Sequence, residues 1–243
     1  MPIRDPQRIV SLVPSLTEAI AATHRQLLIG ATDWCTHPAD LDVARVGGTK
    51  WPDLAAIRAL EPDLVVANAE ENRASDVAAL RASAIPVWMT APATVVQGVD
   101  SLSGLLRAIT GSEPDWLVKT RALWTAPAPI APRRRAVVAI WRRPWMVLGR
   151  DTFAGDLLRH LGVDNVFADH PERYPRIGLG DERIATADLV VLPDEPYQFT
   201  ADDGPEAFPG KTVALISGRH LTWYGPSLLE APKVLLAQLA GGA

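Results

Sequence analysis

Only one cysteine, Cys35, occurs among the 243 residues. A single thiol excludes an internal disulfide, and with it the small secreted domains that depend on several. The sequence also has no apolar run near the ~20 residues that a helix needs to cross a bilayer. Its opening residues, MPIRDPQR, contain no apolar segment and no cysteine for lipid attachment. We therefore expect neither a signal peptide nor direct insertion into a membrane.

The chain carries little of the positive charge that nucleic-acid-binding proteins need. The net charge is −4, and no long basic run is present. We therefore do not expect a nucleic-acid partner. The one local basic cluster, Arg133 to Arg135, precedes an apolar segment, and we interpret it as the solvated entrance of a strand.

Recognisable catalytic and metal motifs are missing as well. The five histidines include no pair at a metal-ligand spacing such as His-x-x-x-His, whereas a zinc site needs three or four convergent ligands. There is no Gly-x-Ser-x-Gly elbow and no recognisable pair of acid and base carboxylates. His37, His170 and His220 fall in expected loops, where they are candidate polar contacts. We expect no catalytic residue, no metal site and no cofactor.

Two parts of the sequence resemble each other on either side of residues 101–132. Each begins with an apolar segment, RIVSLVP at Arg8 or RAVVAIW at Arg135, and continues into a helical pattern. Each later contains a second apolar segment, LEPDLVVA at Leu60 or IATADLVVL at Ile184. This weak self-similarity indicates two related lobes rather than a repeat array. A content of 48% hydrophobic and 21% charged residues predicts that they are packed and globular.

Short strands and helices alternate in both parts, which predicts an α/β fold with parallel sheets. The expected architecture is two similar lobes with parallel central sheets, residues 1–100 and 133–243. A single backbone helix within a linking spine, residues 101–132, joins them, and a ligand cleft lies between the lobes. Residues 101–110 and 115–126 of this spine both look helical, and Pro114 and Pro127 confine its main helix to about residues 115–126.

Two turns from strand to helix carry candidate capping residues. In the first lobe Pro14 ends the strand, and Ser15 or Thr17 is expected to cap the helix that follows. In the second lobe Asp151 or Thr152 is the expected cap. Such turns expose backbone N–H groups at the carboxyl edge of a parallel sheet, although the glycines and the lysine of a phosphate loop are missing here.

Large polar-aromatic side chains are concentrated in the loops that follow strands. Flat rings with an N–H or O–H tip suit a large, rigid and partly apolar ligand. Arg142, Arg143, Arg219 and His220 are placed to meet its polar or anionic groups. For any single aromatic residue, packing within the lobes is an equal alternative, whereas for the set we favour ligand contact. The aromatic residues in question are Trp34, Trp51, Trp141, Trp145, Tyr174, Tyr197, Trp223 and Tyr224.

Four segments resemble a known family. They are RIVSLVPSLTE from Arg8, VGGTKWPDLAAIRALEPDLVVA from Val46, GRDTFAGDLLRHLGVDNVF from Gly149 and LTWYGPSLLEA from Leu221. In this order they resemble the helical-backbone metal receptor superfamily, the class III substrate-binding proteins of ABC importers. The resemblance covers nearly the whole chain and is greatest to the cobalamin-binding members.

The resemblance implies a binding protein, not an enzyme, for a metal chelate: cobalamin first, then haem or a ferric siderophore. It implies a monomer outside the cytoplasm, although the missing signal peptide leaves a cytoplasmic location open. Together with the aromatic pattern it gives the ligand-binding residues Trp34, Trp51, Asn68, Trp141, Trp145, Tyr174, Tyr197, Arg219, His220 and Trp223.

The resemblance also implies docking on an ABC permease through one acidic residue on each lobe. Asp181 or Glu182 suits the second lobe. On the first lobe the expected helix-start position is occupied by Ala55, so Asp53, two residues earlier, is the candidate.

Two other functions stay open on the same fold. One is a cytoplasmic protein or enzyme that handles a corrinoid or chelate, which predicts chemical change of the bound compound and a reactive group such as Cys35 or His220. The other is a regulatory or scaffold protein with a vestigial cleft, which predicts that replacing Trp145 and Trp223 by alanine leaves function intact.

Overall fold

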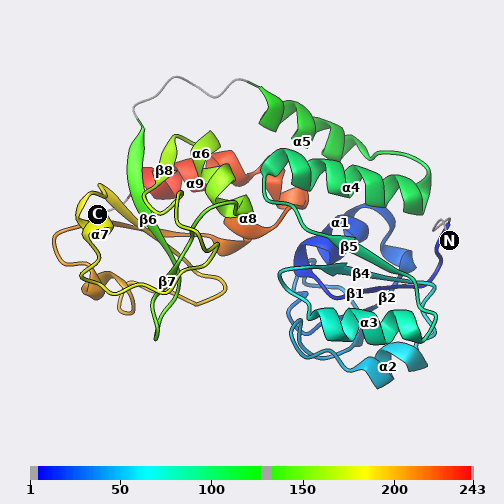
Figure 1. The fold of residues 1–243 in the computed structure, drawn as a ribbon. Helices are drawn as coiled ribbons and strands as arrows, with labels where there is room; N and C mark the ends of the chain where they lie inside the picture. The colour runs from blue at the N-terminus through cyan, green and yellow to red at the C-terminus, as the bar shows by residue number, and fades with distance from the viewer. Residues whose placement is uncertain (1–4, 127–132, 242–243) are drawn as a thin grey trace. The chain divides into compact units, whose positions relative to one another are not determined.

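A computed structural model describes residues 5–126 and 133–241 (Figure 1). The chain divides into two compact units, and each is described by itself. The first lobe consists of Met1–Ala91, Gly98–Arg121 and Tyr224–Pro226. The second lobe consists of Pro92–Gln97, Ala122–Trp223 and Ser227–Ala243. The chain therefore passes between the two units more than once.

The first lobe is built on a five-stranded sheet in the order β3-β2-β1-β4-β5. All neighbouring strands in it are parallel, as expected. Every side chain of β4 is buried, which is typical of a strand in a parallel sheet that is covered on both faces. The strands are β1 (Ile9–Ser11), β2 (Leu28–Ala31), β3 (Ala44–Arg45), β4 (Leu64–Asn68) and β5 (Val87–Thr90).

Helices cover both faces of this sheet. Figure 1 draws α2 (Leu54–Ala59) and α3 (Ala74–Ala82) on one face and α1 (Pro14–His24) on the other. A short 3₁₀ turn, Arg25–Leu27, leads from α1 into β2. The expected cap of α1 is wrong, because Pro14 begins the helix, Val13 is its N-cap, and no side chain caps it. Proline fits the first helical position, where its missing N–H would have no partner within the helix.

Both helical segments expected in the spine, residues 101–110 and 115–126, are present, and the first begins earlier than expected. They are α4 (Val95–Thr110) and α5 (Asp115–Thr125). The longer one is α4, so the expectation that residues 115–126 form the main helix is wrong. Gly111, at φ +75°, follows α4 in the left-handed conformation that glycine adopts without strain. Residues 127–132, also expected in the spine, lie outside the described residues.

The second lobe has a mixed sheet, not the purely parallel one expected. Strands β10, β9 and β6 run in this order and are parallel, and β8 also pairs in parallel with β6. The exception is β7, which pairs antiparallel with β6 because a short turn joins the two. The bounds are β6 (Arg134–Trp141), β7 (Met146–Val147), β8 (Val163–Asn165), β9 (Leu189–Pro193) and β10 (Thr212–Ile216).

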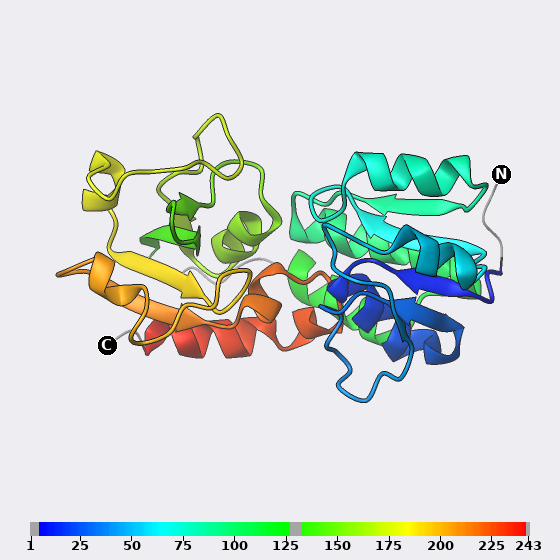
Figure 2. The same cartoon turned by 90° about the horizontal axis from the view of Figure 1, so that it is seen from below.

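Helices and short helical turns complete the second lobe (Figure 2). Thr152 caps the first helix as expected, since its hydroxyl accepts a hydrogen bond from Gly155 N. One core cluster is centred on the fully buried Phe167 and includes Val137, Val190 and Leu192. The helices are α6 (Phe153–His160), α7 (Glu182–Ala185), α8 (Gly218–Thr222) and α9 (Ala231–Ala240), with 3₁₀ turns at Pro205–Ala207 and Pro226–Leu229.

Candidate functional site

Three of the predicted ligand residues lie at one edge of the first sheet. Trp34 follows β2, Trp51 follows β3, and Asn68 is the last residue of β4. Because these strands are parallel, their carboxyl ends meet at the same edge, where α/β proteins commonly bind ligands. The first lobe therefore brings together the residues that were predicted for it.

The two tryptophans at this edge are exposed. Trp34 has 67% and Trp51 has 72% of its surface accessible, an unusual arrangement for the largest apolar side chain. The Trp34 indole lies beside the turn that carries Trp51, since a Cβ on Gly48 would lie 3.6 Å from Trp34 Nε1. Asp53 N donates to Val46 O at 2.8 Å and closes the turn. Exposed aromatic rings on a closed turn are available to a ligand.

Asn68, by contrast, is buried and bonded within the lobe. Its Nδ2 donates to the Tyr224 hydroxyl at 2.7 Å, and its Oδ1 accepts from Glu70 N at 2.7 Å. The Tyr224 hydroxyl also lies 2.7 Å from Thr90 Oγ1, which itself donates to Ala67 O. Burial raises the pKa of Tyr224 well above its usual range, so the hydroxyl stays neutral. Its sequence position identifies Tyr224 as a loop residue but gives no sign of this partnership.

The second lobe gathers aromatic rings at the carboxyl end of β6. Trp141 meets Tyr197 edge to face, with ring centroids 5.6 Å apart. Trp145 stacks on Phe199 at 5.8 Å and meets Phe208 edge to face at 5.1 Å. Trp145 packs against the buried cluster of this lobe, whereas Trp141 is more exposed. The two tryptophans therefore differ in how much of each ring a ligand can reach.

Arg142 connects this aromatic group to an acidic loop. It forms ion pairs with Asp203 and Glu206, and its guanidinium carbon lies 5.5 Å from the Trp145 ring centroid. Tyr197 donates its hydroxyl proton to Asp203 Oδ2 at 2.6 Å. The loop that carries Tyr197 is therefore tied to the residue between the two predicted tryptophans.

A third group follows β9 and β10. Trp223 is buried, and its Nε1 donates to Glu195 Oε2 at 3.1 Å. Arg219 lies over the Trp223 ring, with its guanidinium carbon 5.9 Å from the centroid. His220 Nδ1 lies 2.8 Å from Ser217 Oγ. Tyr174 is elsewhere, on the loop between β8 and α7, with Arg173 6.0 Å from its ring centroid.

Glu195 predicts a measurable dependence of stability on pH. Burial raises the pKa of this carboxyl, and neighbouring Asp194 acts in the same direction. A carboxyl whose pKa is higher in the folded chain than in the unfolded chain binds its proton more tightly when the protein is folded. The protein therefore loses stability as the pH rises from the ordinary glutamate pKa, about 4.3, through the raised value. We expect Glu195→Gln, which keeps an acceptor for Trp223, to remove this part of the pH dependence. Urea unfolding of both proteins at pH 4 and pH 8 checks it, and identical pH slopes would contradict it.

Metal-binding and thiol chemistry find little support in the described residues. Among residues 5–126 and 133–241, no three His, Cys, Asp or Glu side chains form a group that could hold a metal ion. Cys35 is buried, and burial raises the pKa of its thiol, which opposes the reactive thiolate. Thr17 donates to its sulfur at 3.0 Å. None of the described helices is long and apolar enough to span a bilayer.

Two of the three predicted docking acids cap helices. Asp53 Oδ1 accepts from the backbone N–H groups of Ala55 and Ala56, each at 2.9 Å. Asp181 caps α7, and it pairs with Arg183, which lowers the pKa of Asp181. Glu182 lies in the first turn of α7 and is exposed.

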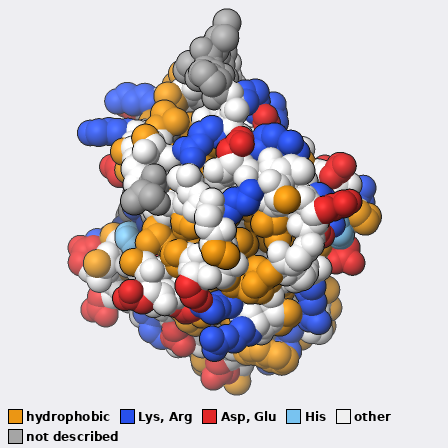
Figure 3. Space-filling view, turned by 90° about the vertical axis from the view of Figure 1, so that its left-hand side faces the viewer, with side chains coloured by type: hydrophobic (Ala, Val, Ile, Leu, Met, Phe, Trp, Pro, Cys, Tyr) orange, Lys and Arg blue, Asp and Glu red, His pale blue; other side chains and the backbone are white. Residues whose placement is uncertain are grey.

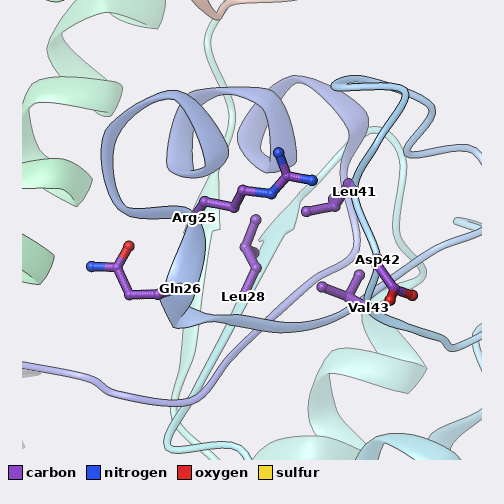
Figure 4. A pocket seen from close by; sticks show the side chains of 6 residues that line it. All are labelled: Arg25, Gln26, Leu28, Leu41, Asp42 and Val43. Carbon is purple, nitrogen blue, oxygen red and sulfur yellow. The ribbon is translucent and has the colours of Figure 1, made fainter.

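A hollow in the first lobe is lined by none of the predicted residues. Figure 4 shows a hollow of about 410 Å³ beside the start of β2, lined by Arg25, Gln26, Leu28, Leu41, Asp42 and Val43. It contains no aromatic side chain, and Arg25 pairs with Asp40 at 2.8 Å. The face in Figure 3 mixes acidic, basic and apolar side chains without a broad region of one sign. Neither feature matches the aromatic chemistry of the strand-end loops.

Comparison with known proteins identifies relatives along nearly the full chain. No family model matches it. A vitamin B12-binding protein of Pectobacterium carotovorum is 23% identical over 252 residues, which cover 96% of this chain and 88% of the relative. A vitamin B12-binding protein of Pectobacterium atrosepticum is 25% identical, with 97% of this chain and 89% of the relative covered.

Solved structures share the fold. The periplasmic vitamin B12-binding protein of Vibrio cholerae has a TM-score of 0.75 and 19% identity, and the match covers 97% of both chains. A periplasmic haem-binding protein solved in complex with two haems has a TM-score of 0.78 and 21% identity, and the match covers 98% of this chain and 99% of that one. The likeness shows an α/β fold with two sheets, each with its own helices.

The curated relatives agree with the resemblance of the sequence segments, and the solved structures agree with the fold that it implies. The relatives are named for binding and not for catalysis, which confirms the expectation of a binding protein that is not an enzyme. Several of the structural relatives are periplasmic proteins. The chain is similar in sequence to vitamin B12-binding proteins and in fold to periplasmic binding proteins.

Proposed function

We propose that this protein binds a metal-chelate ligand, cobalamin first and haem or a ferric siderophore next, and delivers it to an ABC importer. The observation that supports it most is the similarity to vitamin B12-binding proteins over 96% and 97% of the chain. Structural relatives that bind haem make haem the second candidate ligand. Both compounds are large ring chelates of a metal.

The loops at the carboxyl ends of the strands fit such a ligand. In the first lobe Trp34 and Trp51 present exposed rings, and in the second lobe Trp141 does so beside Tyr197. Indole rings provide a large contact area with few rotatable bonds, so little conformational entropy is lost when they bind. Arg219 and His220 lie at the end of β10, where they can meet acidic or amide groups on a ring. The metal belongs to the ligand, so the protein needs no resident ion.

Docking on a permease is part of the same proposal. On the second lobe Glu182 is the better candidate, because it is exposed while Asp181 is engaged by Arg183. On the first lobe Asp53 uses Oδ1 to cap α2, which leaves Oδ2 for a partner arginine. Both positions lie at helix starts, where a carboxylate is favoured electrostatically before any partner binds.

Titration of tryptophan fluorescence tests the ligand. Purified protein is titrated with cyanocobalamin, haemin and a ferric siderophore, and absorbance is recorded alongside. We expect saturable quenching by one compound with a Kd near or below micromolar, about −8 kcal/mol of binding free energy. Quenching should decrease when Trp34 is replaced by phenylalanine and stay unchanged in a Leu215→Ala control, a change at an exposed apolar residue of β10.

Each other outcome of this titration has a distinct meaning. No saturable response to any of the three compounds would contradict the proposal. Saturable binding followed by a slow change of the absorbance spectrum of the bound compound would indicate the alternative function, chemical handling of a corrinoid or chelate.

A further inference from the structure

Trp51 is exposed, yet one face of its ring is covered by a fixed cation. The guanidinium carbon of Arg73 lies 3.6 Å from the indole centroid, which is stacking distance. Since 72% of the side chain is accessible to solvent, the rest of the ring is open. The ring is therefore closed on one side and available on the other.

Arg73 is itself held in place by a buried carboxylate. Its Nε and Nη2 donate to the two oxygens of Asp76, each at 2.8 Å. Only 5% of Asp76 is exposed, in the first turn of α3. A bidentate pair of this kind fixes the plane of the guanidinium as well as its position. Arg73 is thus oriented before it meets the indole, unlike an ordinary surface arginine.

The turn that carries Trp51 is fixed from the same side. Asn72, which is buried, donates from Nδ2 to Thr49 O at 3.0 Å and to Leu12 O at 3.2 Å. Lys50 Nζ donates to Glu70 O. The loop after β4 therefore holds the two residues that precede Trp51. Backbone and side chain are both positioned without a ligand.

We propose that Trp51, Arg73 and Asp76 form a preorganised stacking platform for a flat conjugated ring, with Arg73 and Asp76 as positioning residues. This proposal rests on the proposed function, and it adds that the first lobe contacts the flat ring of the ligand. A guanidinium behind the indole draws electron density from it, so the open face prefers an electron-rich ring system. A side chain held in its bound geometry loses less entropy on binding, and this is what the fixed arginine contributes.

A double-mutant cycle tests the platform with haemin and cyanocobalamin as probes. We expect Trp51→Ala to weaken binding of the probe that saturates the wild type about ten-fold. Arg73→Lys and Asp76→Asn should each weaken it about three- to five-fold. In the Trp51→Ala background neither change should weaken it further, because both act through the ring. Arg81→Lys, on the same helix, is the matched control and should leave the Kd unchanged.

A second readout needs no ligand. Acrylamide quenching of Trp51 in the free protein, obtained as the difference from a Trp51→Phe protein, should increase in Arg73→Lys and Asp76→Asn. If Arg73 and Asp76 are only structural, their variants should lose thermal stability without any increase in quenching of Trp51. Alternatively, they should weaken binding equally with and without Trp51→Ala. Either result would overturn the platform. So would saturable binding that survives Trp51→Ala. If neither probe binds the wild type and quenching of Trp51 is also unaffected, both proposals fail; if only binding is missing, the proposed function fails.

Discussion

Replacing Gly149 by alanine is expected to lower the free energy of unfolding by about 3 kcal/mol. A Cβ at this position would lie 2.0 Å from the carbonyl oxygen of Glu172 and 3.0 Å from Pro175 Cδ. Gly149 N also donates to Arg173 O at 2.7 Å, so the two backbones cannot separate without losing that bond. Both obstacles are main chain or ring atoms, which do not move aside as a flexible side chain would.

Urea denaturation of the purified variant measures this loss. Gly178→Ala is the matched control, because a Cβ there would have no atom within 4 Å. That change should lie within about 0.5 kcal/mol of wild type. A loss of equal size in both variants would show that close approach of the backbone is not the cause. Since the loop that Gly149 holds carries Tyr174, the variant should also bind the ligand more weakly than its lost stability explains.

Asn68→Ala is expected to cost about 2 to 3 kcal/mol of unfolding free energy. The buried amide bonds the Tyr224 hydroxyl and Glu70 N, each at 2.7 Å, and both groups lose a partner when it is removed. Thr90 Oγ1 and Ser15 remain as partners of the tyrosine hydroxyl. Removing a hydrogen-bond partner from a buried polar group costs more than the net value of the bond that it had made.

Thermal and urea unfolding, with ligand titration alongside, separate two roles for Asn68. Gln26→Ala removes an exposed amide that bonds only its neighbour His24 at 3.2 Å among the contacts described, and it should change stability by less than about 0.5 kcal/mol. If Asn68 is structural, the variant loses stability while the remaining folded protein keeps its Kd. Unchanged stability with a weaker Kd would instead support the predicted ligand contact.

Much of the fold follows from patterns that lie close together in the sequence. The apolar segment Leu64–Asn68 is a strand because a short β-branched run suits a sheet buried on both faces, and Thr212–Ile216 is a partly exposed strand at the edge of the second sheet. The cap at Thr152 follows from one hydroxyl before an apolar run. The helix α4 begins at Val95 rather than at residue 101, where the helical pattern was expected to start, since Val95 and Val96 fit a strand as well as a helix. Asp156, far along the chain, accepts from Val95 N at 2.9 Å at that helix start.

The candidate site was predictable in composition and less so in arrangement. Strand-end tryptophans indicated an aromatic surface, and Trp34 and Trp51 are exposed there. No local pattern indicates that Trp145 packs on Phe199 and Phe208, since residues far along the chain decide whether a ring on a loop faces the core or solvent. Arg73 and Asp76 were missed for the same reason. Their signal is an Arg at the helix start with Asp three residues later, a spacing as common on ordinary solvated helices.

The placement of residues 224–226 in the first lobe has a consequence for how the chain is made. Tyr224 completes the hydrogen bonds of Asn68 and Thr90 at the edge of the first sheet, although it comes near the end of the 243-residue sequence. Synthesis runs from the N-terminus, and domains made first commonly fold first. Here the first lobe must wait for almost the whole polypeptide to leave the ribosome before its last three residues arrive. Until then the buried side chains of Asn68 and Thr90 lack the Tyr224 hydroxyl as a partner. The first lobe is therefore synthesised first but completes its hydrogen bonds late.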